Sequence, residues 1–276
     1  MSAPPAVNVL TVSIVLFQSP LAQLRDLIDS LIDSLSGAAI SRVHCVLVDH
    51  SLDLSYAEQC RALLTEYDAC EQIEFELLVS AHNRGYGAGH NLAMNSLSGT
   101  FHLILNPDVV LAPHAISAAL ETLETHNDCV LLAPVGAAPD GTSLDLAKAY
   151  PSVWALTLRA FAPLWLRRRS RAVARYELRN QPSDTLRPVP LASGCCMWVR
   201  RAAYDDAGGF DERYFLYFED FDLSMRMARH GAVIEHRELT IVHHGGKASR
   251  KGGRHLLWFC LSAVRFFNRW GWRWLG

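Results

Sequence analysis

Residues 9–17 read VLTVSIVLF, an apolar and largely β-branched run that predicts a buried β-strand. The run ends near Pro20, and apolar residues then recur at the spacing of an amphipathic helix: Leu21, Leu24, Leu27, Ile28, Leu31, Ile32 and Leu35. Further strands are predicted at 42–49, 74–79, 101–105 and 191–199, with helical patterns between them. After the last of these strands, a helix is predicted to end at Gly231, and two short extended pieces follow at 232–234 and 239–242. This alternation of apolar strands and helices predicts an α/β domain whose mostly parallel, Rossmann-like sheet has helices on both faces.

The bulk composition is that of a folded enzyme-sized protein. Of the 276 residues, 50% are hydrophobic and 20% are charged, which excludes a mostly disordered chain. The formal net charge of -2 argues against a nucleic-acid-binding protein, although arginines are concentrated between Arg167 and Arg201. The length fits one large α/β domain or two smaller domains.

Cysteine usage and the N-terminus predict a cytoplasmic protein. The 7 cysteines are odd in number and show no CxxC pair or zinc spacing, so we expect reduced thiols, most of them in the core. The first nine residues carry no basic region, and the apolar run that follows is shorter than a signal peptide or a membrane span requires.

An acidic segment at 208–223, GGFDERYFLYFEDFDL, is the strongest indication of chemistry in the sequence. It sets five carboxylates among bulky aromatic and apolar residues. Burying an acid beside apolar rings raises its pKa and costs stability, so such a pattern is typical of functional acids. The alternative is a surface turn whose acids are solvated.

Polar residues also follow the predicted strands. Asp49 ends the second strand, and Asn106-Pro107-Asp108 follows the fourth, where parallel sheets bind ligands. Taken alone, Asp49 also fits a turn cap and Asn-Pro-Asp a β-turn. The glycine-rich stretch 83–91 precedes a helix predicted from about Leu92, where its backbone amides would approach an anion; the alternative is a plain turn.

With these residues in hand, the chain resembles a bacterial family 2 glycosyltransferase of the GT-A fold, most similar to the rhamnosyltransferase-like branch. The resemblance runs from about Val9 to about Arg250 and rests on motifs in the family's order. They are the first strand, Asp-x-Ser at 49–51, Asn-x-Gly-Tyr-x-x-Gly-x-Asn at 83–91, Asn-Pro-Asp at 106–108, Ser-Gly to Arg-Arg at 193–201, Gly-Gly-Phe-Asp-Glu at 208–212, Glu-Asp-x-Asp-Leu at 219–223 and a distal histidine.

The resemblance implies a GT-A domain over 1–250, with a variable insertion or loop region at 134–190, followed by a basic, aromatic helical tail at 251–276. It implies inverting transfer of a sugar from a nucleotide-diphosphate donor to a hydroxyl of a glycan or polyprenyl-linked acceptor, in synthesis of lipopolysaccharide, O-antigen or a related glycan. L-Rhamnose from a dTDP donor is the first choice of sugar. Another UDP, GDP or dTDP sugar and a catalytically silent nucleotide-sugar-binding subunit are the alternatives.

The same resemblance implies roles for individual residues. Asp220 is the expected general base, which deprotonates the acceptor hydroxyl. The acceptor side would include Gly194, Asp211 and Glu219. The donor would be bound by a larger set of residues: Asp49, Ser51, Asn83, Arg84, Gly85, Asn106, Asp108, Lys247 and Arg250. Lys247 and Arg250 lie on a glycine-rich loop that would close over the donor.

A divalent cation, Mg²⁺ or Mn²⁺, is the cofactor that the resemblance implies. Asp108 would ligate it through oxygen, together with the donor diphosphate. Asn106 stands where the family has its first metal-binding Asp, so a strict metal requirement is left open. His244 lies at the spacing of the family's metal-binding histidine, and His243 is the alternative, because strand residues alternate between faces.

Two segments, 164–171 and 256–275, combine arginines with tryptophan and leucine. This composition suits the headgroup layer of an anionic membrane and predicts peripheral contact with the cytoplasmic face of the inner membrane. The alternative is helices packed on the core with solvated arginines. Charges interrupt the tail too often for it to span a bilayer.

Overall fold

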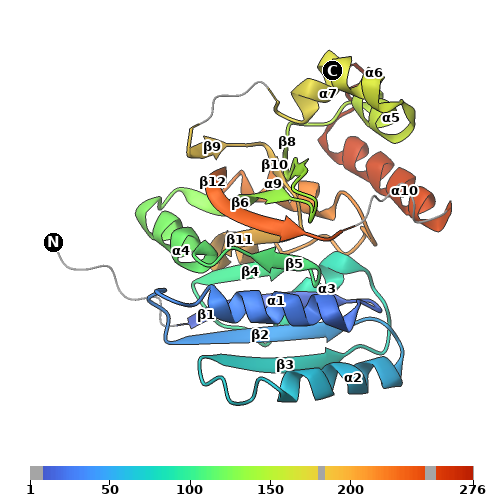
Figure 1. Cartoon of the computed structure of the whole chain (residues 1–276). Helices are drawn as coiled ribbons and strands as arrows, with labels where there is room; N and C mark the ends of the chain where they lie inside the picture. The colour runs from blue at the N-terminus through green and yellow to red at the C-terminus, as the bar shows by residue number, and fades with distance from the viewer. Residues whose placement is uncertain (1–8, 180–183, 246–252, 276) are drawn as a thin grey trace.

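The computed structural model describes residues 9–179, 184–245 and 253–275 (Figure 1). The strands are β1 Val9–Leu16, β2 Arg42–Asp49, β3 Ile73–Val79, β4 Phe101–Leu105, β5 Val109–Leu111, β6 Cys129–Ala137, β7 Ser143–Leu144, β8 Ala147–Lys148, β9 Leu186–Pro188, β10 Leu191–Ala192, β11 Cys196–Arg200 and β12 Ala232–His243. The helices are α1 Leu21–Asp33, α2 Leu54–Thr65, α3 Tyr86–Met94, α4 Ala115–Thr125, α5 Val153–Phe161, α6 Leu164–Arg169, α7 Arg171–Tyr176, α8 Arg201–Asp206, α9 Glu219–Met227 and α10 Gly253–Trp270.

The main sheet has the strand order β3-β2-β1-β4-β11-β6-β12-β5. Strands β3, β2, β1 and β4 are mutually parallel, and β6 is parallel to β12. Strand β11 runs antiparallel between β4 and β6, and β5 is antiparallel to β12. The predicted α/β class with a mostly parallel sheet is confirmed.

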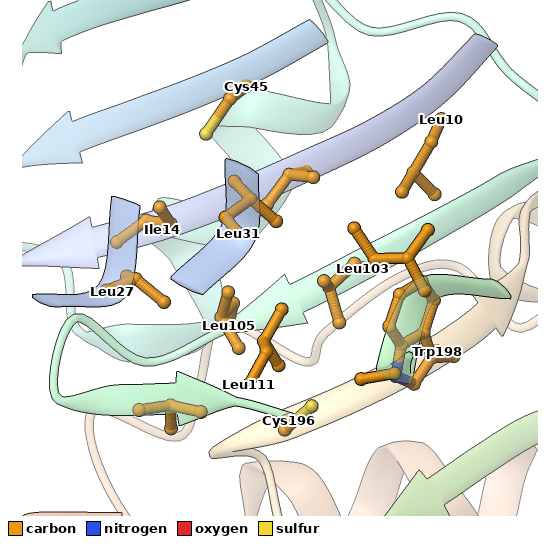
Figure 2. Close-up of a cluster of buried hydrophobic side chains, with 14 of the residues drawn as sticks. Leu10, Ile14, Leu27, Leu31, Cys45, Leu103, Leu105, Leu111, Cys196 and Trp198 are labelled. Carbon is orange, nitrogen blue, oxygen red and sulfur yellow. The ribbon is translucent and has the colours of Figure 1, made fainter. Parts of the chain in front are cut away.

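Alternate strand residues pack on opposite faces of this sheet, and helices cover both. Leu103 and Leu105 of β4 point to the face covered by α1, α2 and α4, while Ile104 points to the face covered by α3, α8 and α9. Figure 2 shows the first of these cores, where Leu27 and Leu31 of α1 meet β1, β4 and β11. The rule behind this arrangement is that successive side chains of a strand alternate in direction.

Helix α3 differs from the prediction, because it begins at Tyr86 and not near Leu92. The glycines of this stretch serve close packing. A Cβ on Gly87 would lie 2.7 Å from Phe210, and one on Gly89 would lie 2.6 Å from Val15. Gly87 and Gly89 therefore lie inside the helix and pack against neighbouring side chains, instead of forming the loop before it that was expected to approach an anion.

Three other predicted elements also differ. Residues 191–199, expected as one strand, divide into β10 and β11, because the Ser193 amide donates to the Leu146 carbonyl and the Gly194 amide to Asp220, so the backbone between them leaves the sheet. Conversely, the two short strands expected within 232–242 form one strand, β12, with an irregularity between His236 and Thr240. Helix α9 ends at Met227, before the expected stop at Gly231.

Helices α5, α6, α7 and α10 gather at the top of the view in Figure 1. The backbone joins α5 to the end of the chain, because the amides of Val153 and Trp154 donate to the carbonyls of Arg273 and Trp274. The region 134–190 thus contains short strands and helices of its own. Within the described ranges, no helix combines the length and the apolar character needed to cross a bilayer.

Candidate active site

The acid Asp220 lies in the first turn of α9. This helix begins directly after two residues with left-handed backbone. Tyr217 has a φ of 70° and Phe218 a φ of 64°, a conformation that costs a non-glycine residue of order 1 kcal/mol or more and is found at functional sites. The Asp220 carboxylate accepts hydrogen bonds from the amide of Gly194 (2.9 Å) and from the amide of Phe221 (2.8 Å). Two backbone groups thus fix its orientation.

The pKa values of the two neighbouring acids are both raised. Burial raises the pKa of Asp220 to about 6, although the Gly194 and Phe221 amides favour its charged form and oppose this rise. Burial, followed by the nearby charge of Asp220, raises the pKa of Glu219 well above its ordinary value. In the described part of the chain, Glu219 Oε2 has no hydrogen-bond partner. The pair therefore combines an acid that ionises near pH 6 with a buried neighbour that holds its proton more tightly than a free glutamic acid does.

Asp108 lies against a histidine, and that histidine is His243. The Asp108 Oδ1 to His243 Nε2 distance is 3.2 Å, and Asn106 Nδ2 lies 3.4 Å from the same ring nitrogen. His244, the first choice from sequence, donates its backbone amide to the Asp108 carbonyl at 2.9 Å. Buried Asn106 Oδ1 has no hydrogen-bond partner within the described residues. Carboxylate, amide oxygen and neutral imidazole are suitable ligands for Mg²⁺ or Mn²⁺.

Asp49 is a buried carboxylate at the carboxyl end of β2. Its Oδ1 accepts a hydrogen bond from the Ser51 amide at 2.8 Å, while Oδ2 has no partner among the described residues. The Ser51 hydroxyl accepts from the Gln18 amide at 2.7 Å. Because a buried carboxylate oxygen is costly to leave unsatisfied, Asp49 suits a ligand that donates N–H groups.

Nearby, the 83–85 segment forms a turn at the start of α3. Asn83 Oδ1 accepts a hydrogen bond from the Gly85 amide at 2.9 Å, and Arg84 pairs with Glu212 at 2.6 Å. Gly85 has a φ of 97°, and a Cβ there would lie 2.2 Å from the Phe215 carbonyl oxygen. Only glycine permits this approach between the turn and the segment that leads to α9.

Backbone contacts join the Asp108 and Asp220 regions. The Asn106 amide donates to the Cys195 carbonyl at 2.8 Å, and Gly194, next in the chain, donates to Asp220. Burial raises the pKa of the Cys195 thiol to about 12, and the charges of Asp108 and Asp220 both add to this rise. The break between β10 and β11 therefore lies between the two acids.

Other expected site residues have different surroundings. Asp211 pairs with Arg213 (2.6 Å) and with Arg269 of α10 (3.0 Å), and hydrogen bonding from Arg213 lowers its pKa to about 2. Its carboxylate is thus engaged between a loop and α10. Lys247 and Arg250 lie outside the described residues.

Tyr86 was not among the residues predicted from sequence. Its hydroxyl donates to the Gly194 carbonyl, and its place as the aromatic of the 83–91 motif was the available signal.

Comparison with known proteins gives the family. The family model described as glycosyltransferase-like family 2 matches residues 9–242. An N-acetylglucosaminyl-diphospho-decaprenol L-rhamnosyltransferase of Mycobacterium tuberculosis is 35% identical over 181 residues, which is 61% of this chain and 58% of that protein. The chain thus matches little more than half the length of this relative.

Solved structures share the fold at low identity. A mannosyltransferase from Pyrobaculum calidifontis, in complex with GDP-Man and Mn²⁺, superposes with a TM-score of 0.60 at 15% identity and covers 93% of this chain and 64% of its own. S. aureus TarS 1-349 in complex with UDP-GlcNAc gives a TM-score of 0.58 at 15% identity, covering 94% and 66%. The chain therefore belongs to the glycosyltransferase-like family 2 and shares the GT-A-like fold of these structures.

Proposed function

We propose that this chain is a glycosyltransferase that inverts the anomeric carbon of its donor sugar, with Asp220 as general base. The observation that carries the proposal is the orientation of the Asp220 carboxylate by the Gly194 and Phe221 amides, with a pKa of about 6. Such an acid is ionised at neutral pH and basic enough to accept a proton. The acceptor oxygen attacks the anomeric carbon, its proton passes to Asp220, and the nucleotide diphosphate leaves from the opposite face.

The donor-binding role falls to the carboxyl ends of β1, β2 and β4. Asp49, whose Oδ2 has no partner among the described residues, would accept hydrogen bonds from the base. Ser51, Asn83, Arg84 and Gly85 would flank the nucleotide. Lys247 and Arg250 remain proposed donor ligands on the sequence alone. Gly194 and Glu219, which adjoin Asp220, are the proposed acceptor-side residues. Asp211 is the third proposed acceptor-side residue, and its carboxylate pairs with Arg213 and Arg269.

Asp108 and His243 would hold a divalent cation, with Asn106 alongside, and we place His243 ahead of His244 because its ring faces Asp108. A bound Mg²⁺ or Mn²⁺ would neutralise charge on the leaving diphosphate. Two protein ligands leave most of the coordination shell for water and diphosphate oxygens, as is usual for such ions. A fold relative solved with Mn²⁺ supports this assignment.

The M. tuberculosis relative supports the choice of substrates. That protein is an L-rhamnosyltransferase that acts on a sugar linked through diphosphate to decaprenol. We propose L-rhamnose from a dTDP donor and a polyprenyl-linked acceptor for this chain, in the synthesis of lipopolysaccharide, O-antigen or a related glycan on the cytoplasmic face of the inner membrane. The alternatives are another UDP, GDP or dTDP sugar, or a silent nucleotide-sugar-binding subunit.

We also propose that the enzyme contacts an anionic membrane through α5, α6, α10 and the residues after α10. Among the described residues, seventeen large apolar side chains are exposed, and twelve of them lie in these segments. They include Phe161, Trp165, Leu257 and Leu261, and the exposed Arg168, Arg169 and Arg171 lie nearby in sequence. Apolar anchors beside arginines suit anionic headgroups.

The test of the catalytic proposal is Asp220→Asn, assayed with a panel of nucleotide-sugar donors and a diphosphate-linked lipid acceptor. Turnover is expected to fall about 10²- to 10⁴-fold while nucleotide binding by calorimetry is retained. Asp205→Asn, which changes an exposed acid, is the matched control. Retained turnover in Asp220→Asn would refute the base assignment. Donor binding without transfer in the wild type, across the whole panel, would favour the silent subunit.

A further inference from the structure

Tyr86 forms hydrogen bonds to two backbone segments near Asp220, the connection between β10 and β11 and the segment before α9. Its hydroxyl donates to the Gly194 carbonyl at 2.5 Å, and the Gly194 amide donates to the Asp220 carboxylate at 2.9 Å. Its own amide donates to the Phe215 carbonyl at 3.1 Å, on the segment that leads into α9. One residue of α3 thus ties together the β10–β11 break and the segment that carries the acid.

The Tyr86 ring itself is held rigidly. It packs edge-on against His90 at 4.5 Å between ring centroids and against Phe210 at 6.0 Å. The His90 ring is fixed in turn, because its Nδ1 lies 2.6 Å from the buried hydroxyl of Ser13 on β1. The Tyr86 ring is therefore fixed relative to strand β1 of the central sheet, and its hydroxyl binds Gly194 from that fixed position.

Gly194 depends on this support. It is a glycine with no side chain of its own to fix it, and its two peptide groups are held at one end by Asp220 and at the other by Tyr86. A Cβ at this position would lie 3.2 Å from both the Asp220 Cβ and the Tyr86 Cε1 atoms. Without the tyrosine hydroxyl, the Gly194 carbonyl is free to rotate, and the amide on the other side of the same Cα loses its alignment with the carboxylate.

We infer that Tyr86 is a positioning residue for the general base: it fixes Gly194 so that the Gly194 amide holds the Asp220 carboxylate in place. The inference rests on the proposed role of Asp220. Its chemical effect follows from the hydrogen bond to the charged form, since the Gly194 amide lowers the pKa of Asp220 against the effect of burial. The other titratable groups that influence Asp220 or are influenced by it are Glu219, Tyr176 and Cys195.

The test is the pH dependence of kcat/KM for Tyr86→Phe, which keeps the ring and its packing but removes the hydroxyl. The wild type is expected to show an acid limb near pH 6, because Asp220 must be ionised. In Tyr86→Phe this limb should move up by about half a unit or more, with turnover about tenfold lower at pH 6.5 and partly recovered at pH 8. Gly194→Ala should move the limb in the same direction.

The control is Tyr204→Phe, which removes another buried tyrosine hydroxyl, one that donates to Asn91. It should lower the melting temperature comparably and leave the acid limb in place. An unmoved limb in Tyr86→Phe, with an inactive Asp220→Asn, would overturn the positioning role and leave the base assignment intact. An active Asp220→Asn would instead refute the base itself.

Discussion

The Trp270 indole donates to the Asp222 carboxylate at 2.8 Å and so joins α10 to the helix that carries Asp220. Asp222 is fully buried and also pairs with Arg226 (2.7 Å) and Arg269 (3.1 Å). Phe218, just before α9, packs on Phe266 of α10. The C-terminal helix, expected as a tail, thus packs against the helix that carries Asp220, and its apolar outer face is left exposed.

Asp222→Ala should be strongly destabilising, because it leaves the buried guanidinium of Arg226 without its carboxylate partner and the Trp270 indole without its acceptor. We expect a loss of about 3–5 kcal/mol in the free energy of unfolding, measured by urea denaturation. Asp205→Ala is the control, since it breaks an Arg–Asp pair of the same i,i+4 spacing at the surface. Its cost should stay below about 1 kcal/mol. Equal costs for the two variants would contradict a structural role for the buried pair.

Glu219→Gln should stabilise the protein more at pH 8 than at pH 5. The raised pKa of Glu219 in the folded state means that the folded protein holds this proton more tightly than the unfolded chain does. Protonated Glu219 therefore makes its full contribution to the free energy of unfolding at pH values below its pKa in the unfolded chain. This contribution is lost as the pH rises toward the pKa of Glu219 in the folded state. Glutamine removes this loss. Urea denaturation at both pH values measures it, with the exposed Glu58→Gln as control; a pH-independent difference would argue against a buried, protonated Glu219.

Much of the fold follows from local sequence, as β2 and β4 illustrate. Both occur at their predicted bounds, because most of their residues are apolar, as is typical of strands buried on both faces. Strand β1 also reads as apolar, yet Thr11 and Ser13 within it are buried and hydrogen-bond to His102. Only the packing of β1 against its neighbours shows that these hydroxyls have partners.

The site was harder to predict, because its details depend on long-range contacts. Position 87 requires a glycine because a Cβ there would clash with Phe210, which is distant in sequence. Which of His243 and His244 faces Asp108 depends on the alternation along β12, and the irregularity between His236 and Thr240 prevents that alternation from being counted from sequence. Acids such as Asp49 and Asp220 are indicated by local motifs. Tyr86 also belongs to one, but its contact with Gly194, which is distant in sequence, cannot be read from that motif.

Gly85→Ala should destabilise the protein by more than its backbone strain alone. Gly85 and Gly141 both have a positive φ, but a Cβ at Gly85 would meet the Phe215 carbonyl whereas one at Gly141 would meet open space. Gly141→Ala is therefore the control, with an expected cost of about 1–2 kcal/mol. Gly85→Ala should cost clearly more and lower activity, because the segment before α9 must move. Urea denaturation and turnover measure both effects, and equal costs would show that the close approach is unimportant.

His243→Ala should weaken the response to Mn²⁺. Loss of a group that merely orients a metal ligand costs about 10- to 100-fold in affinity, so loss of this ring should raise the half-activating Mn²⁺ concentration at least about tenfold. His244→Ala tests the alternative, since His244 offers Asp108 its backbone amide, which alanine retains. A larger shift in His244→Ala than in His243→Ala would assign the ligand to His244. Metal titration of initial rates gives the result.

The membrane proposal predicts that vesicle binding depends on the outer face of α10. Leu256, Leu257 and Leu261 are between 52% and 57% exposed. Replacing all three with glutamine removes apolar surface that the bilayer would otherwise bury, and should reduce partitioning onto phosphatidylglycerol-containing vesicles at least about tenfold in a sedimentation assay.

The matched control replaces Leu54 and Leu92, exposed leucines on α2 and α3, with glutamine, and should bind vesicles like the wild type. Pure phosphatidylcholine vesicles test the contribution of the arginines, because each arginine near an anionic surface adds about 1 kcal/mol that is lost without negative headgroups or at high salt. If the α10 triple variant binds as well as the wild type, the exposed leucines serve some other contact, and the acceptor must reach Asp220 without the enzyme docking through this face.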